Sequence, residues 1–158
     1  MSEVTIVELS PQLVLGMRKT GAYKEIPMMF HRICEFAFSK NIPIAAYPAF
    51  LWHETTVEEA QEADLEGNAD IEVVFPISEL IETTRDDEIR VYELPGGKMA
   101  KIVHKGPYEE CTLTYEKLFS WITENGKRIV GPVREVYLND PQEVQPEEIL
   151  TEIYAPLD

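Results

Sequence analysis

A glutamate stands among aromatic residues near the end of the sequence, in the segment 131–138, which reads GPVREVYL. Alternation along a strand places Glu135 and Tyr137 on one face and Arg134 on the other. A carboxylate among aromatic rings favours an organic cation, and one whose pKa is raised by burial can act as a general base. The alternative is an exposed strand glutamate paired with Arg134 or a lysine. The segment therefore indicates cation binding, base catalysis or an ordinary surface position.

Aromatic residues elsewhere in the chain are candidates for a pocket around Glu135. The candidate ligand-binding aromatic residues are Tyr137, Tyr154, Tyr108, Trp52 and Phe50. Aromatic side chains at helix or strand spacing usually belong to a core, so their presence alone decides nothing. A tyrosine needs a partner for its hydroxyl, which favours a cleft wall for Tyr137 and Tyr154. His104 is expected at the surface or at the end of a strand.

The sequence lacks the patterns of several other kinds of site. Its three histidines and two cysteines are scattered without metal-ligand spacing, so no metal is expected. It has no Walker loop, dinucleotide fingerprint or Gly-x-Ser-x-Gly elbow, and no cofactor is expected. The cysteines, Cys34 and Cys111, make no disulfide framework, which indicates a reducing compartment.

The secondary-structure elements that must position these residues occur in two copies along the chain. Segments 3–40 and 88–125 share one pattern at a constant offset of 85 residues, as in Gly21 and Gly106. Two β-rich runs, a Gly-x-Tyr turn and an amphipathic helix occur in each, and two further strands follow. A repeat of this length that occurs twice indicates two similar halves around one core, with a ligand cleft between the halves.

Each half is predicted to run strand, strand, helix, strand, strand. The apolar faces of the two predicted helices hold Ile26, Met29, Phe30, Ile33, Cys34 and Ala37 in the first half, and Cys111, Tyr115, Leu118, Phe119 and Ile122 in the second. The acidic stretch between Glu54 and Glu72 is predicted to be helix or loop. Counted from Pro48 against Pro132, Glu135 takes the place of Leu51 in the first half. We expect one α+β domain over residues 1–158, with a mainly antiparallel sheet and two main helices. Repeat one covers about 1–80 and repeat two about 86–158.

The charge of the chain is strongly negative. Fourteen basic and 29 acidic side chains give a formal net charge of -15, which argues against direct nucleic-acid binding. No Lys or Arg lies between Lys40 and Arg85. We interpret this acid as a solvated surface, with a docking face for a protein partner as the alternative. The sequence shows neither a secretion signal nor a membrane-spanning run, so a cytoplasmic protein without membrane contact is expected.

Three runs of the sequence are similar to a known family. HKGPYEE from His104, ENGKRIVGPVREVYLNDP from Glu124 and LTEIYAPL from Leu150 resemble the GyrI-like small-molecule-binding domain. This module also serves as the effector-binding domain of AraC-type and MerR-type transcription regulators. The resemblance covers essentially the whole chain and is strongest in the second half.

The resemblance implies two strand-helix-strand-strand repeats around a hydrophobic cleft. In the multidrug regulators of this family, an acidic residue in the cleft contacts cationic drugs, and Glu135 matches that position. Tyr137 and Tyr154 match recurrent aromatic positions, and Tyr108 matches the Gly-Pro-Tyr turn. The regulators carry a helix-turn-helix region ahead of the domain, whereas this chain starts at the first strand. Direct DNA binding is therefore not expected.

Three functions follow from these residues. The leading hypothesis is a stand-alone module that captures a small hydrophobic or cationic aromatic molecule, for sequestration or sensing. The second is a hydrolase in which Glu135 activates a water that opens a strained cyclopropane-type ring, while a tyrosine such as Tyr137 orients or protonates the substrate. The third is a protein-interaction module similar to the gyrase inhibitor, which would use the acidic surface.

Overall fold

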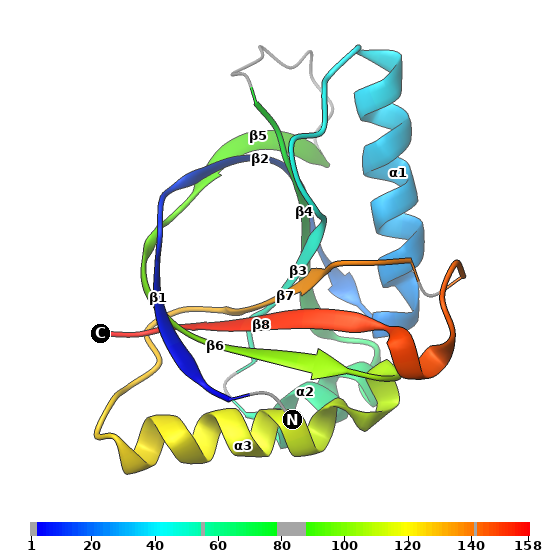
Figure 1. Ribbon diagram of the computed structural model, residues 1–158. Coiled ribbons are helices and arrows are strands. Elements are labelled where there is room, and N and C mark those ends of the chain that lie inside the picture. The colour runs from blue at the N-terminus through cyan, green and yellow to red at the C-terminus, as the bar shows by residue number, and fades with distance from the viewer. Residues whose placement is uncertain (1–2, 55, 79–87, 141) are drawn as a thin grey trace. The chain divides into compact units, whose positions relative to one another are not determined.

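The computed structural model describes residues 3–54, 56–78, 88–140 and 142–158 (Figure 1). Its strands and α-helices are, in chain order, β1 (Thr5–Leu9), β2 (Gln12–Gly21), α1 (Ile26–Ser39), β3 (Ala49–Trp52), α2 (Val57–Glu66), β4 (Ala69–Pro76), β5 (Ile89–Leu94), β6 (Gly97–Lys105), α3 (Cys111–Glu124), β7 (Val133–Tyr137) and β8 (Leu150–Pro156). Short 3₁₀ turns precede α1, α3 and β8. The strands pair antiparallel, and the α+β class is confirmed.

The sequence repeat is also a structural repeat. In both copies, the tyrosine of Gly-x-Tyr begins a 3₁₀ turn and the helix starts three residues later. Helices α1 and α3 are each 14 residues long, and they end at Ser39 and Glu124, which keeps the offset of 85. The same local signals therefore fold in the same way twice.

The chain forms two compact units that exchange their first strands. Unit 1 comprises Met1–Ser10 and Gly96–Asp158, and unit 2 comprises Pro11–Pro95. In unit 1 the strand order is β1-β6-β8-β7, and in unit 2 it is β3-β4-β2-β5. The first strand of repeat one thus pairs in the unit of repeat two, and the first strand of repeat two pairs in the unit of repeat one. The chain passes between the units at Pro11 and again at Pro95.

In unit 2, helix α1 covers one face of the sheet. Met29, Ile33 and Ala37 are buried, and the Phe30 ring meets the Phe75 ring of β4 edge-on at 5.5 Å. The prediction that Cys34 lies on this apolar face is wrong, because Cys34 is exposed. The buried stripe is narrower than the predicted one, and the residue after Ile33 is already about 100° around the helix.

In unit 1, helix α3 packs on β6 (Figure 1). Its buried residues are Cys111, Tyr115, Leu118 and Ile122, four of the five that the sequence pattern predicts, while Phe119 is half-buried. The helix ends before Gly126, whose φ of 68° gives the left-handed residue expected after a helix terminus.

Most of the acidic stretch between Glu54 and Glu72 forms helix α2. Thr56 caps its N-terminus by accepting a hydrogen bond from the Glu59 amide at 3.0 Å, and Glu58 and Glu59 complement the positive end of the helix dipole. Gly67 ends it with a φ of 71°. Among the helices that the structure describes, none has the length and apolar character required to cross a membrane.

Candidate functional site

Glu135 lies in the middle of β7, on the face of the unit 1 sheet that helix α3 covers. β7 pairs with β8, so that Glu135 is opposite Ile153 and Tyr137 is opposite Thr151. The hydroxyl of Tyr137 donates to Glu135 Oε1 at 3.0 Å, which confirms that the two residues share a face. The Tyr115 hydroxyl, from α3, donates to Glu135 Oε2. The carboxylate is therefore held between a strand and a helix by two phenols.

Two further residues join this group, which we call the Glu135 cluster: Glu135, Tyr137, Tyr115, Tyr108 and His104. The Tyr108 ring meets the Tyr137 ring edge-on, with centroids 5.4 Å apart and planes at 65°. Tyr108 is 37% exposed, while Tyr115 is only 6% exposed. The cluster thus runs from a solvent-accessible aromatic ring to a buried one.

The prediction that His104 lies at the surface is wrong, although it does lie near the end of β6. Its side chain is buried, because Thr114 of α3 and the turn after β6 cover it. Nε2 is 2.9 Å from the Pro107 carbonyl and must donate to it, since a carbonyl only accepts. In the neutral ring, Nδ1 then accepts from the Thr114 hydroxyl at 2.7 Å. This arrangement fixes the ring beside Glu135.

Burial dominates the ionisation of the cluster. It raises the pKa of Glu135 above the ordinary glutamate value, against the opposite effects of the bonds from Tyr115 and Tyr137 and of nearby His104. It also raises the pKa of Tyr137 well above the usual tyrosine value, and the adjacent carboxylate adds to this effect. The tyrosine therefore stays protonated and donates, while burial disfavours the ionised form of the glutamate.

Tyr154, another predicted ligand-binding residue, lies on a different face of the unit 1 sheet. Tyr154 is opposite Arg134 on β7, so it is on the sheet face away from Glu135. Its hydroxyl donates to Glu152 at 3.0 Å, and the Lys101 ammonium lies 5.6 Å from its ring centroid. Burial raises the pKa of Tyr154, with the Glu152 charge as the next cause.

Phe50 and Trp52 belong to β3 of unit 2, where both are buried. They share the sheet face of α1, because Phe50 is opposite Val73, which alternates with the α1-contacting Phe75 on β4. The Tyr23 ring meets the Phe50 ring edge-on at 5.5 Å. Tyr23 and Tyr108 correspond at the offset of 85 residues, and each contacts an aromatic ring of the strand that follows its helix.

The match of Glu135 to Leu51 is wrong by one residue. Leu51 is opposite Glu72, on the sheet face away from α1, whereas Glu135 is on the helix side. The segment between the helix and Pro132 is one residue shorter than the segment between the helix and Pro48. The offset of 85 therefore continues through the strand and pairs Glu135 with Phe50, since a slip of one residue moves a side chain to the other face.

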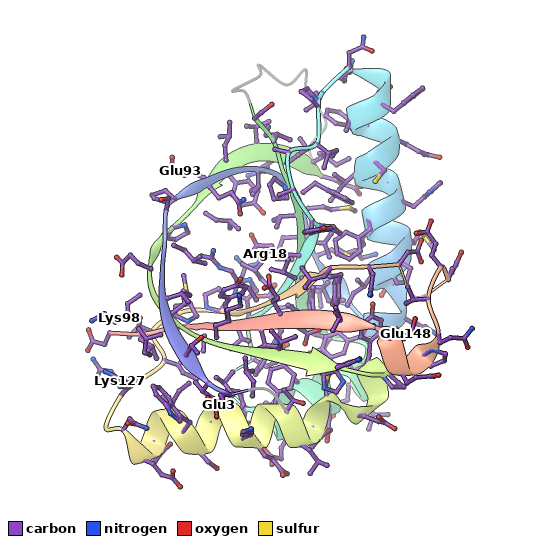
Figure 2. The ribbon with its side chains drawn as sticks, in the orientation of Figure 1. Glu3, Arg18, Glu93, Lys98, Lys127 and Glu148 are labelled. Atoms are coloured by element: carbon purple, nitrogen blue, oxygen red, sulfur yellow. The ribbon has the colours of Figure 1, made fainter. Side chains whose placement is uncertain are left out.

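A further carboxylate, Glu72 of β4, is buried and was not singled out from the sequence. Glu72 is 7% exposed, and it accepts from His53 Nε2 at 2.8 Å and from the Tyr92 hydroxyl at 2.6 Å. Arg18, labelled in Figure 2, is opposite Glu72 on β2 and binds Asp70 through two hydrogen bonds of 2.8 and 2.6 Å. Strand alternation does not reveal Glu72, because it places Glu72 with Asp70 on the face opposite Ile71 and Val73, as for an exposed residue.

Hydrogen bonding outweighs burial at Glu72. Burial acts to raise the pKa of this carboxyl, but the bonds from His53 and Tyr92 leave the pKa below the ordinary value. Burial and the Glu72 carboxylate raise the pKa of Tyr92 far above the usual tyrosine value. The ionised form of Glu72 is thus favoured, whereas the ionised form of Glu135 is disfavoured. In the part of the chain that the structure describes, no group of three His, Cys, Asp or Glu side chains could hold a metal ion.

The fold agrees with the family whose model matches the sequence. The model of the GyrI-like small molecule binding domain matches residues 2–158, and the chain belongs to this family. A comparison with curated proteins finds no match.

Solved structures share the fold at low sequence identity. The crystal structure of the EcmrR C-terminal domain has a TM-score of 0.84 and 21% identity, and covers 100% of this chain and 98% of that chain. EcmrR in a complex with DNA has a TM-score of 0.85 and 20% identity over 99% of this chain, which spans 57% of the EcmrR chain. SAV2435 bound to tetraphenylphosphonium has a TM-score of 0.60 and 13% identity, over 99% of this chain and 94% of that chain. At these identities the likeness is one of fold.

Proposed function

We propose that the protein binds a cationic aromatic small molecule at the Glu135 cluster. The observation that carries this proposal is a carboxylate with a raised pKa beside aromatic rings, on the covered face of the unit 1 sheet. Such a carboxylate gains from the approach of a positive charge, because a cation offsets the cost of its burial. The ring faces of tyrosines attract the same cation.

The aromatic members of the cluster favour a flat or aryl-substituted ligand. Tyr108 is partly exposed and meets Tyr137 edge-on, so a ligand ring can replace or extend this contact. The two phenols that donate to Glu135 leave lone pairs on its oxygens, because a carboxylate has about four acceptor positions. The ligand's charge therefore acts on Glu135 without displacing Tyr115 or Tyr137. Binding of this kind suits sequestration or sensing of toxic cations.

The proposal is tested with tetraphenylphosphonium, the cation bound to SAV2435. Titration calorimetry compares wild type, Glu135→Gln and the control Glu152→Gln, which alters the opposite sheet face. Glu135→Gln should weaken binding by about tenfold or more, since removal of one buried charge of a pair costs upwards of about 2 kcal/mol. Neutral triphenylphosphine oxide should bind wild type and Glu135→Gln with equal affinity. Equal affinity of the cation for wild type and Glu135→Gln would overturn the proposal.

The raised pKa of Glu135 also supports a second candidate, a hydrolase. In this proposal the carboxylate takes a proton from water, and the water oxygen attacks a carbon of a strained cyclopropane ring. The ring bond breaks, its electron pair stays on the other carbon of that bond, and a tyrosine hydroxyl such as that of Tyr137 protonates this carbon. The tyrosine then regains a proton from Glu135, to which it is hydrogen-bonded. Mass spectrometry of cyclopropane-bearing electrophiles incubated with the protein separates the two functions. Product with wild type and none with Glu135→Gln supports the hydrolase, whereas binding without product supports the binding function.

A further inference from the structure

Thr151, on β8, has a buried hydroxyl without a partner. The residue is 0% exposed, and among the described residues its Oγ1 has no hydrogen-bond partner. An unsatisfied buried hydroxyl costs about 1–3 kcal/mol, and a valine of the same shape would avoid that cost. Its neighbours along β8 on the same face are apolar, with Ile153 and Ala155 both fully buried. A polar atom at this position therefore needs a reason.

The hydroxyl belongs to the face that carries the Glu135 cluster. Thr151 is opposite His104 on β6 and opposite Tyr137 on β7, so its side chain projects between these two members of the cluster. The cross-strand pair of Glu135 and Ile153 comes next along the sheet. A ligand held by Glu135 and Tyr137 would thus have the Thr151 hydroxyl within the same site.

The polar neighbours of Thr151 are already committed elsewhere. His104 Nε2 donates to the Pro107 carbonyl, and His104 Nδ1 bonds the Thr114 hydroxyl. The Tyr137 hydroxyl gives its single proton to Glu135. The donors of His104 and Tyr137 are therefore already used, whereas the hydroxyl of Thr151 is not.

We propose that the Thr151 hydroxyl is a ligand contact that selects cations bearing a polar oxygen, such as an alcohol or a carbonyl. This inference rests on the proposed cation binding at Glu135. Charge and aromatic surface would then hold the ligand core, while Thr151 recognises one hydrogen-bonding group attached to it. The ligand class is narrowed from lipophilic aromatic cations to hydroxylated or carbonyl-bearing ones, because a purely apolar cation leaves Thr151 unsatisfied.

The test uses two matched series of probes with the full chain. One series is hydroxyalkyl-triphenylphosphonium cations of graded chain length, and the other is alkyl-triphenylphosphonium cations in which a methyl replaces the hydroxyl. Affinities are measured for wild type, Thr151→Val and Thr151→Ser. Thr151→Val keeps the shape and removes the hydroxyl, while Thr151→Ser keeps the hydroxyl. Thermal denaturation of each variant reports whether the fold is retained.

For at least one chain length, wild type should prefer the hydroxylated probe. Thr151→Val should weaken that probe by about threefold to tenfold, the worth of one neutral hydrogen bond, and leave its alkyl match unchanged. Thr151→Ser should restore the preference. A uniform effect of Thr151→Val on both series, or no effect on either, would mean a structural or water-bound hydroxyl and would overturn the inference.

The failure of the proposed function is distinguishable from this outcome. If alkyl probes bind wild type and Glu135→Gln weakens them, while Thr151→Val changes no preference, only the Thr151 inference fails. If no cation binds wild type, the proposed function fails and the Thr151 inference falls with it.

Discussion

The phenol of Tyr92 occupies the space that a side chain at Gly16 would fill. A β-carbon at residue 16 would overlap the Tyr92 hydroxyl and two carbons of its ring. The two residues lie on neighbouring strands, since β2 pairs with β5. Glycine at this position therefore lets Tyr92 cross β2 and donate to Glu72 on the strand beyond.

The Gly16→Ala variant should lose stability by about 2 kcal/mol or more, because the methyl overpacks against the ring and breaks the bond to Glu72. Denaturant unfolding of the variant and of wild type measures the loss. In a Tyr92→Ala background, the same substitution should cost much less, since the space is then open. Equal losses in both backgrounds would contradict the steric explanation.

The Tyr92→Phe variant should be less stable than wild type by about 1–3 kcal/mol near neutral pH, the worth of a hydrogen bond to a charged group. Because the folded-state pKa of Glu72 is lowered, this stabilisation is present above the unfolded pKa and is lost as the pH falls through the folded pKa. The gap between the two unfolding free energies should therefore narrow below about pH 4. A gap that is constant with pH would show that ionised Glu72 is not the acceptor that matters.

The Glu135→Gln variant should be at least as stable as wild type at neutral pH, because the ionised carboxylate is disfavoured in the folded state. The pKa of Glu135 is raised in the folded state, so wild-type stability falls as the pH rises from the unfolded value, about 4.3, to the folded value, and is level above it. Each unit of raised pKa corresponds to about 1.4 kcal/mol. The difference between variant and wild type should therefore grow with pH over this window, as measured by urea unfolding at several pH values. A difference that shrinks instead would refute the assigned direction.

The affinity for tetraphenylphosphonium should increase with pH and then level off. A bound cation favours the charged form of Glu135, so it lowers a pKa that is raised in the empty protein. Binding therefore releases a proton at pH values below the raised pKa. Calorimetry in buffers of different ionisation enthalpy measures this release. In Glu135→Gln, the same titration should show no such pH dependence; a shared dependence would place the proton elsewhere.

The Tyr115→Phe variant should shift the pH dependence of tetraphenylphosphonium affinity to higher pH. Tyr115 donates to Glu135 and thereby lowers its pKa, so removal of the hydroxyl raises the pKa further. At pH values within the transition, the cation should bind more weakly to the variant, by on the order of threefold to tenfold. At higher pH the affinities should converge, because Glu135 is then ionised in both. A loss that persists at high pH would instead indicate damaged packing of the Tyr115 ring.

The repeats and their elements could be predicted because their signals are local. Alternation along one strand placed Glu135 with Tyr137, and the Gly-x-Tyr turn marked the start of both helices. The partners of the acid could not be read in this way. Tyr115 has the spacing of a core residue, and its hydroxyl contact depends on how α3 lies on the sheet.

Other features of the structure depend on contacts between distant parts of the sequence and could not be predicted from local patterns. His104 is buried by Thr114 and by the turn after β6, and neither contact follows from strand periodicity. Glu72 was read as part of an acidic surface, because its partners His53 and Tyr92 are distant in the sequence. The exchange of β1 and β5 between units depends on pairing over most of the chain, for which no local signal exists.

The strand exchange sets an order of events during synthesis. Unit 2 is one continuous segment, Pro11–Pro95, so all of its strands are present once residue 95 has been made. β1 is made before unit 2, yet its partner β6 begins only at Gly97. The earliest strand therefore leaves the ribosome long before its neighbour and waits with its backbone hydrogen-bonding groups unpaired while unit 2 forms. Completion of unit 1 then joins β1 to β6, a strand that is made only after the whole of unit 2.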